Sequence, residues 1–318
     1  MISGTPPASA LELASGYQFK ALSNAALWRE RAWAFTRERA LLGTVLVAGE
    51  GINFSLAGAT VALDQWLDWL ASGPGLDAPV LHRQRVERAP FQRLRVRLRD
   101  EIVTFDPDAC PDRDGTATHL DPAAWNVLIA RPDVQLVDAR NDYEYRIGTF
   151  SGAQNPGTES FTEFKRYCDQ MLDRDRPVAM FCTGGVRCEK AGAWMKRAGY
   201  AEVYQLEGGI LRYLAQTEAN ESRWRGECFV FDDRVAVGPD LSATGRIVCR
   251  GCRRAVAGLD AAGNPPLGDD DDGCRACGKV LDADRAASLR ERARQLRLAE
   301  ARGEIHLGPG AQVKGTPA

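Results

Sequence analysis

Two patterns of apolar residues divide the first part of the chain. Between residues 17 and 105, short runs typical of strands are separated by two stretches with the periodicity of amphipathic helices. A glycine turn, Gly49-Glu50-Gly51, joins two of the runs as a hairpin. The order strand–helix–strand–strand–helix–strand predicts a ferredoxin-like α+β domain over residues 15–106. We expect strands at 17–22, 43–48, 52–57, 80–86 and 94–104, and helices at 24–39 and 60–71.

A second domain, over residues 117–217, alternates strands with helices. Residues 177–181 are apolar without interruption, as in a strand that is buried on both faces of a parallel sheet. The alternation of such runs with helical periodicity predicts an α/β domain whose parallel sheet is covered by helices. Residues 106–112, rich in proline and aspartate, read as a linker. We expect strands at 134–138, 177–181 and 203–206, and helices at 162–171 and 188–198.

The two ends of the chain have patterns of their own. Residues 1–14 are expected to form a disordered lead. In the C-terminal extension, residues 218–318, the stretch 227–237 predicts a strand that docks on the preceding domain. Two cysteine pairs and a helix at 282–302 follow, and the last dozen residues are expected to be a disordered tail. The fold class is therefore α/β, with a small Cys-rich metal-ribbon segment near the C-terminus.

Composition narrows the choice of partners. The 318 residues carry a formal net charge of −2, so any basic surface has to be local. The sequence contains no apolar run long enough to span a membrane, and the N-terminus lacks the regions of a signal peptide. We therefore expect a cytoplasmic protein that binds neither a membrane nor DNA, and the sequence leaves its oligomeric state open. In that compartment, nine cysteines favour catalysis or metal binding over disulfides.

The loop after the apolar run at 177–181 is the strongest candidate for chemistry. Cys182 begins the loop Cys-Thr-Gly-Gly-Val-Arg, between a predicted strand and a predicted helix. Open α/β sheets bind ligands at this end of their strands. The glycines let successive N–H groups turn inward as an anion-binding nest, and the helix N-terminus and Arg187 add positive potential. Together they lower a thiol pKa and favour a nucleophilic thiolate. The loop residues expected to contact a substrate are Thr183, Gly184, Gly185 and Val186.

Each of the three candidate catalytic residues has an alternative role. Cys182 could be an ordinary buried cysteine, but its position between a strand and a Gly-Gly turn favours catalysis. Arg187 is expected to close the loop by hydrogen bonding to its carbonyl groups, with direct substrate contact as the second interpretation. Cys188 could resolve an oxidised Cys182 as a disulfide, or be a partly buried thiol that points away from the pocket.

Four stretches of the second domain occur in the order and spacing of a known family. They are residues 136–140, 152–156, 182–187 and 199–210. In these stretches the chain resembles the rhodanese family, whose loop cysteine carries sulfur as a persulfide. The resemblance implies the same capacity for Cys182. Related phosphatase loops have one more residue before the arginine, so the shorter loop in this sequence argues against a phosphatase.

A closer resemblance extends into the first domain. It rests on Ala48-Gly49-Glu50-Gly51-Ile52-Asn53 and on residues 90–96, 137–145, 181–190, 207–210 and 229–234. Over about residues 17–237 the chain resembles the rhodanese-domain tRNA uridine hydroxylases of bacteria. This resemblance implies that tRNA is the substrate, that molecular oxygen is the cosubstrate, and that 5-hydroxyuridine at the wobble position is the product. Cys182 would be the active-site cysteine.

A local basic pattern occurs in the first domain. The run from Arg93 to Arg99 alternates arginine with an aliphatic residue, so a strand would place the arginines on one face. Such a face suits phosphate groups, which position an RNA without reading its sequence. The alternative is a solvated strand face, paired with nearby Asp100 and Glu101. With the resemblance, we expect Arg93, Arg95 and Arg97 to contact tRNA.

The four C-terminal cysteines form a CxxC…CxxC pattern of nearly zinc-ribbon spacing. Four thiolates can close a tetrahedral structural zinc site, and the segment around them has little apolar content of its own. The alternatives are four reduced surface thiols or an iron site. The expected metal ligands are Cys249, Cys252, Cys274 and Cys277.

Three functions compete at this stage. The first is oxygen-dependent hydroxylation of the wobble uridine, the second is persulfide sulfur transfer without an RNA substrate, and the third is a non-catalytic RNA-binding role. The Cys182 loop argues against the third. How oxygen is activated does not follow from the residues: there is no dinucleotide-binding fingerprint, and three histidines give little support to a two-histidine iron site.

Overall fold

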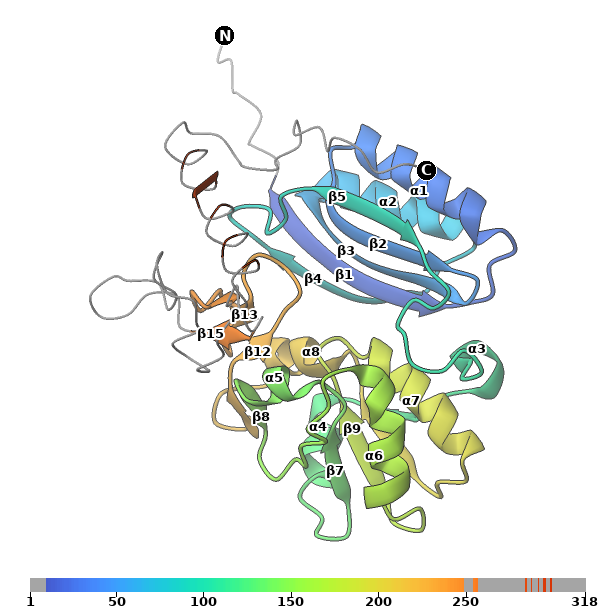
Figure 1. The fold of residues 1–318 in the computed structure, drawn as a ribbon, viewed down its shortest axis with the longest axis vertical. Coiled ribbons are helices and arrows are strands. Elements are labelled where there is room, and N and C mark those ends of the chain that lie inside the picture. Colours follow the sequence, from blue (N-terminus) through green and yellow to red (C-terminus); the bar gives the residue numbers. More distant parts are fainter. Residues whose placement is uncertain are drawn as a thin grey trace, which may run out of the picture.

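A computed structural model describes residues 10–248 and 254–256 and six separate positions between 284 and 298. The four predicted metal ligands, Cys249, Cys252, Cys274 and Cys277, lie outside the described residues. Two layered domains make up most of the described chain, and Figure 1 shows them one above the other. None of the helices in the described part is both long and apolar enough to cross a bilayer.

The first domain is a five-stranded sheet with two helices. Asn24 caps the first helix, because its side chain accepts the N–H of Leu27. The strand order is β4-β1-β3-β2-β5, and β5 runs parallel to β2 whereas the other neighbours are antiparallel. The elements are β1 (Leu11–Phe19), α1 (Ala25–Glu38), β2 (Leu42–Ala48), β3 (Gly51–Ala59), α2 (Thr60–Ser72), β4 (Val80–Arg85) and β5 (Leu94–Leu98).

Two predicted boundaries in this domain are wrong. Strand β1 begins at Leu11, inside the segment 1–14 that was expected to be a disordered lead. It pairs with β3 along its whole length, and Leu13 and Ala14 are buried, so tertiary pairing orders residues with no clear pattern of their own. Strand β5 ends at Leu98 instead of residue 104. The chain turns there, because the carboxylate of Glu101 accepts the N–H groups of Phe105 and Asp106.

The two faces of this sheet have different neighbours. Helices α1 and α2 cover one face (Figure 1). On that face Val45 and Val47 pack with Trp66 in an apolar core. Residues that alternate with these along the strands point the other way. Thr44 and Leu46 on β2 belong to this second face, and they line a cavity at the boundary with the second domain. The face without helices is therefore available to form part of a site.

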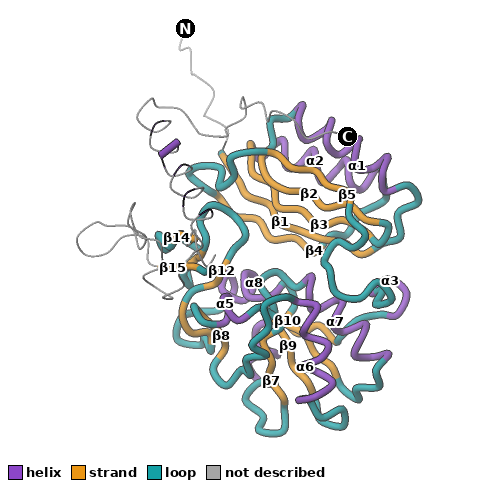
Figure 2. The backbone as a smooth tube through the Cα atoms, in the orientation of Figure 1, coloured by secondary structure: helices purple, strands orange, loops and turns teal. Residues whose placement is uncertain are grey.

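The second domain contains the predicted parallel sheet, which is confirmed. Its strand order is β6-β10-β9-β7, and all four residues of β9 are buried, as the apolar run required. The tube drawing in Figure 2 shows β7, β9 and β10 beside α6 and α7. The elements are α3 (Pro111–Asp114), β6 (Thr118–Leu120), α4 (Pro122–Leu128), β7 (Gln135–Asp138), α5 (Asp142–Tyr145), β8 (Gly148–Phe150), η1 (Phe161–Glu163), α6 (Phe164–Met171), β9 (Val178–Phe181), α7 (Val186–Arg197), β10 (Val203–Leu206) and α8 (Gly209–Gln216).

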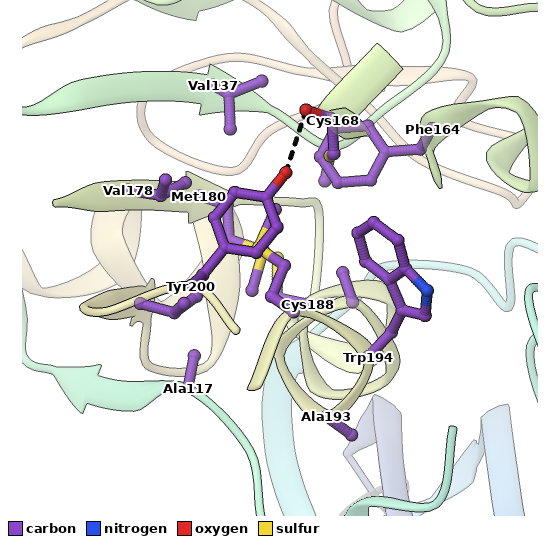
Figure 3. Close-up of a cluster of buried hydrophobic side chains, with 14 of the residues drawn as sticks. Ala117, Val137, Phe164, Cys168, Val178, Met180, Cys188, Ala193, Trp194 and Tyr200 are labelled. Atoms are coloured by element: carbon purple, nitrogen blue, oxygen red, sulfur yellow. Dashed lines mark hydrogen bonds between the residues drawn. The ribbon is translucent and has the colours of Figure 1, made fainter. Parts of the chain in front are cut away.

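Apolar cores lie on both sides of the parallel sheet. One of them packs α6 and α7 against the strands, and Figure 3 shows Phe164, Met180 and Trp194 among its members. Within it, the hydroxyl of Tyr200 donates to the carbonyl of Cys168 at 2.9 Å. The other core packs α4 and α8 against the opposite face. Strand β6 and helices α4 and α8 were not predicted, since elements of three to eight residues show little periodicity.

The stretch 227–237 docks on the second domain as predicted, but not as one strand. Asp232 reverses the chain, because its carboxylate accepts the backbone N–H and the guanidinium of Arg234. The result is a short hairpin, whose tip residues 230–235 we call the hairpin tip. The strands of the extension are β11 (Trp224–Gly226), which pairs with β8, the hairpin pair β12 (Cys228–Phe229) and β13 (Ala236–Val237), and the pair β14 (Ile247–Val248) and β15 (Ala255–Val256).

Candidate active site

The Cys182 loop lies where the sequence predicted it, between β9 and α7. The Sγ atom of Cys182 accepts the backbone N–H of Gly185 at 3.1 Å. Gly185 has a φ of +101°, which L side chains rarely adopt. Gly209 has to be a glycine as well, because a Cβ atom there would lie 2.5 Å from the carbonyl oxygen of Cys182. The loop is therefore shaped by glycines from two separate parts of the chain.

The surroundings of Cys182 favour its thiolate form. The side chain is 1% exposed, and burial alone would raise its pKa. Hydrogen bonding from Cys188, the charge of Arg187 and the backbone N–H groups of Cys188 and Arg187 outweigh burial and lower the pKa to about 6. The N–H groups of the loop thus face the sulfur, as expected for an anion nest.

Arg187 does not close the loop through carbonyl groups, so that prediction is wrong. Its guanidinium forms two parallel hydrogen bonds of 2.8 Å with the carboxylate of Glu144 on α5. Glu144 is fully buried, and although burial opposes ionisation, the charge of Arg187 holds the pKa of the carboxyl below its ordinary value. Sequence reasoning missed Glu144, although its spacing from Asn141 is that of a helix-capping box.

Cys188 interacts with Cys182 instead of pointing away from it. It is fully buried in the core of α6 and α7, where Figure 3 places it near Met180. Burial raises the pKa of the Cys188 thiol far above its ordinary value, and the charge of Cys182 raises it further. Cys188 is therefore a neutral thiol that donates toward the Cys182 sulfur. Disulfide formation between the two stays a prediction.

The loop lies on the wall of a cavity of about 520 Å³ between the two domains. The second domain contributes Cys182, Thr183, Gly184, Val186 and Arg187 to the lining. Thr183 also lies 3.4 Å from a carboxylate oxygen of Glu144, whereas Gly185 is covered by the hydroxyl of Tyr17 and does not line the cavity. From the other side come first-domain residues, among them Tyr17, Thr44, Asn53, His82 and Arg99, and hairpin-tip residues, among them Phe231 and Arg234.

Helix α7 is tied to the first domain by buried polar contacts that sequence reasoning missed. Lys190 is fully buried and forms ion pairs with Glu50 at 2.6 Å and Glu101 at 2.7 Å. Glu189, the residue before Lys190 on the same helix, accepts a hydrogen bond of 3.0 Å from the hydroxyl of Tyr17. The glycine turn around Glu50 predicted a hairpin, but nothing local indicated a partner 140 residues away. Ion pairs and a hydrogen bond therefore connect the two domains that enclose the cavity.

The three predicted RNA-contacting arginines are exposed and lie on or beside β5. Arg95 and Arg97 are paired in register with Thr44 and Leu46, so they lie on the sheet face that borders the cavity. Glu101, expected as a partner in the solvated-face alternative, pairs with Lys190 instead. Within residues 10–248, no ion pair involves Arg93, Arg95 or Arg97. The arginine row therefore carries positive charge that is not held in ion pairs within these residues.

Comparison with known proteins decides the family. A protein of Teredinibacter turnerae named tRNA uridine(34) hydroxylase is 41% identical to this chain over 304 residues, which cover 95% of this chain and 94% of that protein. The chain belongs to the tRNA uridine(34) hydroxylase family. Two domain models agree with this: the UPF0176 acylphosphatase like domain matches residues 11–102, and the Rhodanese-like domain matches residues 122–216. The first domain of this hydroxylase-family chain is therefore acylphosphatase-like, and the second is a rhodanese domain.

Solved structures resemble single domains of this hydroxylase-family chain. A rhodanese-like domain from Anabaena sp. is 20% identical with a TM-score of 0.29, covering 34% of this chain and 78% of that one. An acylphosphatase from Coxiella burnetii is 17% identical with a TM-score of 0.22, covering 28% of this chain and 92% of that one.

Proposed function

We propose that this protein hydroxylates the wobble uridine of tRNA to 5-hydroxyuridine, with molecular oxygen as cosubstrate, in the cytoplasm. The observation that carries the proposal is the position of Cys182, whose pKa is lowered to about 6, on the wall of a cavity between the two domains. The named function of the relative that is 41% identical supports the same substrate.

The cavity suits one base that has left its stack. Its volume of about 520 Å³ is within the usual range of small-molecule sites, roughly 300–1,000 Å³. Phe231 lines it and is 65% exposed, with its ring centre 5.9 Å from the guanidinium carbon of Arg187. An exposed aromatic ring offers a stacking surface to an extruded base. We propose that the uracil ring stacks on Phe231 and presents C5 to Cys182.

The arginine row would hold the rest of the RNA. Arg93, Arg95 and Arg97 are exposed, and alternate residues on a strand are about 7 Å apart. Contacts from such a row go to phosphates, so they position the anticodon without reading it. Recognition of the base itself is left to the cavity.

The two cysteines can account for the electrons of the reaction. When one oxygen atom of O2 is inserted into the C5–H bond to give C5–OH, the other atom becomes water and takes up two electrons and two protons. Cys182 and Cys188 supply both electrons when they form a disulfide, which an external thiol then has to reduce. The Cys188 thiol supplies one proton, and water supplies the other because Cys182 is a thiolate. This step rests on the interaction of the two sulfur atoms described above.

A second candidate is persulfide sulfur transfer to a thiol acceptor. The loop favours it too, because the N–H groups that face Cys182 would stabilise a persulfide anion equally well. In that reaction neither the basic strand nor the exposed Phe231 has a role.

One experiment separates these candidates. Purified protein is incubated with unmodified tRNA and a reducing thiol under heavy-isotope oxygen, and the digested nucleosides are analysed by mass spectrometry. We expect 5-hydroxyuridine that carries the heavy oxygen. An unchanged wobble uridine, together with sulfur transfer from thiosulfate, would support the second candidate and remove the first. Nucleoside analysis of cells with and without the gene gives the same distinction in vivo.

A further inference from the structure

A second cavity lies beside the one that contains Cys182. Its volume is about 380 Å³, and it shares a wall with the first cavity. The shared residues come from the first domain and the hairpin tip, and Phe231 is the most exposed of the large apolar side chains among them, at 65%. Molecules bound in the two cavities would therefore be direct neighbours. The shared residues are Thr44, Phe91, Val230, Phe231 and Asp232.

The lining of the second cavity combines aromatic rings with positive charge. Phe91, Phe229 and Phe231 contribute rings, and Arg93 and Arg95 contribute guanidinium groups. Neither arginine forms an ion pair with another described residue. Burial lowers the pKa of Arg95, and repulsion from the neighbouring arginines lowers it further. Two cations without an ion-pair partner among the described residues, beside aromatic rings, favour a ligand with a phosphate and a planar base.

Two acidic residues also line this cavity, and they offset its positive charge only in part. Asp232 is already paired with Arg234 through two hydrogen bonds, at 2.9 and 2.6 Å. Asp233 is exposed and interacts with Gln92, Arg88 and Arg95. Its backbone N–H also donates to the carbonyl of Pro90 at 2.9 Å, which fastens the hairpin tip to the first domain. The cavity is thus built by the first domain and the C-terminal extension.

We propose that the second cavity binds the nucleotide next to the uridine whose base enters the Cys182 cavity. Phe231, on the shared wall, separates the two bases, and Arg93 and Arg95 hold the phosphate of the neighbour. This inference rests on the proposed function, since it takes a tRNA anticodon as the ligand. Such a site makes binding of the RNA depend on the sequence or flexibility of the nucleotides beside the target base.

The test uses the full chain and anticodon stem-loop RNAs with the target uridine. An abasic residue replaces either neighbour of that uridine in turn, and the dissociation constant is measured by fluorescence anisotropy at constant ionic strength. Loss of a base that stacks on aromatic rings weakens binding by about fivefold to a hundredfold. We expect a loss in this range for at least one neighbour. Unchanged affinity for both abasic RNAs would overturn the proposal.

A pair of matched variants tests the same site from the protein side. Arg93→Ala, just before β5, removes a guanidinium from the second cavity, whereas Arg97→Ala removes one from β5 outside that cavity. We expect Arg93→Ala to weaken binding of the intact RNA several-fold more than Arg97→Ala. Equal effects of the two variants would contradict the assignment. Circular dichroism checks that both variants fold.

Failure of the inference is distinct from failure of the proposed function. In parallel, the wild-type protein is tested for 5-hydroxyuridine formation on the intact stem-loop. If no product forms, the proposed function is refuted. If product forms while both abasic RNAs bind as tightly as the intact one, only the second binding site is refuted.

Discussion

At the scale of single residues, the site is a set of charges that stabilise one another. The Cys182 sulfur receives N–H groups from its own loop, and the cation beside it, Arg187, is itself held by a buried carboxylate, Glu144. A buried cation without such a partner would be strongly disfavoured. The ionisation of Cys182 therefore depends on a residue that does not touch it.

The first prediction concerns the ionisation of Cys182. Because its pKa is about 6, the thiol is mostly protonated below that pH and mostly thiolate above it. We expect its rate of alkylation by iodoacetamide to rise with pH, with a midpoint near pH 6. Cys188→Ala removes a hydrogen bond to the thiolate, so the midpoint should move to higher pH. Mass spectrometry of the peptide that contains Cys182 measures the rate.

Cys168→Ala is the matched control for this experiment. Cys168 is buried in the same core, where burial raises the pKa of its thiol, but it does not contribute to the lowered pKa of Cys182. The midpoint should not change in this variant. A wild-type midpoint at the ordinary thiol pKa would contradict the electrostatic account of the loop. Cys182→Ala itself should abolish hydroxylation and leave the melting temperature nearly unchanged.

The second prediction concerns Glu144. Glu144→Gln leaves the buried Arg187 without its counter-charge and should cost about 3–5 kcal/mol in the free energy of unfolding, measured with urea. The pKa of Glu144 is lower in the folded protein than in the unfolded chain. Its stabilising effect is therefore fully present above the unfolded pKa and is lost as the pH falls through the folded pKa. The variant should lack this part of the acid sensitivity.

Asp142→Asn is the control for Glu144→Gln. Asp142 lies on the same short helix, but its partner Arg146 is largely exposed. Exposed pairs contribute little because water screens them. If both substitutions destabilise the protein equally, the buried pair has no special role.

At the scale of elements, helix α7 links the two domains. Within one turn it places Arg187 toward Glu144, Glu189 toward Tyr17 and Lys190 toward Glu50 and Glu101, in three different parts of the fold. The start of this helix also supplies the N–H groups that face Cys182. Displacing α7 would therefore disturb both the loop and the domain boundary.

The third prediction concerns Lys190. Lys190→Met leaves two carboxylates without their buried partner, and we expect a loss of about 3–5 kcal/mol in the free energy of unfolding. The segment after β5 should also become accessible to limited proteolysis, because Glu101 is no longer held. Lys196→Met, on an exposed position of the same helix, is the matched control and should leave both measurements unchanged.

The fourth prediction concerns β5. The double variant Arg95→Ala with Arg97→Ala should weaken binding of different tRNAs by similar factors, because phosphate contacts carry no sequence information. The dependence of log Kd on log salt should become shallower by about one unit for each lost phosphate contact. Filter binding at several salt concentrations measures both effects.

The double variant Arg31→Ala with Arg37→Ala removes the same charge from α1, on the opposite side of the sheet. This control should bind tRNA like the wild type. A salt dependence that is equally reduced in both double variants would mean that the charge acts from a distance, and that β5 makes no direct contact.

At the scale of the whole molecule, the site belongs to neither domain alone. The rhodanese domain provides the nucleophile, the acylphosphatase-like domain provides the opposite wall, and the hairpin tip provides Phe231 and Arg234. Each of the two domains has an apolar core of its own. Only their docking encloses the volume in which a base can meet Cys182.

The fifth prediction concerns the C-terminal cysteines. We propose that Cys249, Cys252, Cys274 and Cys277 bind one structural zinc ion, on the basis of their spacing. Elemental analysis of the purified protein should find one zinc per chain, and serine at all four positions should remove it. Residues 10–248 should retain their fold in that variant, because their apolar cores contain none of these cysteines. A full zinc content in the serine variant would exclude these ligands.

Local sequence pattern predicted those residues whose surroundings are formed by residues close to them in the chain. The position of Cys182 follows from an apolar strand before it and a glycine turn and helix after it, all within residues 178–197. The partners of Arg187 and Lys190 lie 43 and 140 residues away, and no periodicity connects them. The carbonyl contacts expected for Arg187 were wrong for this reason.

The amino-acid sequence by itself determined the kinds of secondary structure, the buried parallel strand and the cysteine at its end, because apolar periodicity and glycine act over a few residues. Tertiary structure alone decided which carboxylate neutralises Arg187, which face of the first sheet meets the loop, and where the two cavities lie. Charge pairing and cavity shape depend on distances in space between segments that the chain order leaves far apart. The nucleophile is therefore visible in the sequence, whereas the enclosure that gives it a substrate exists only in the folded molecule.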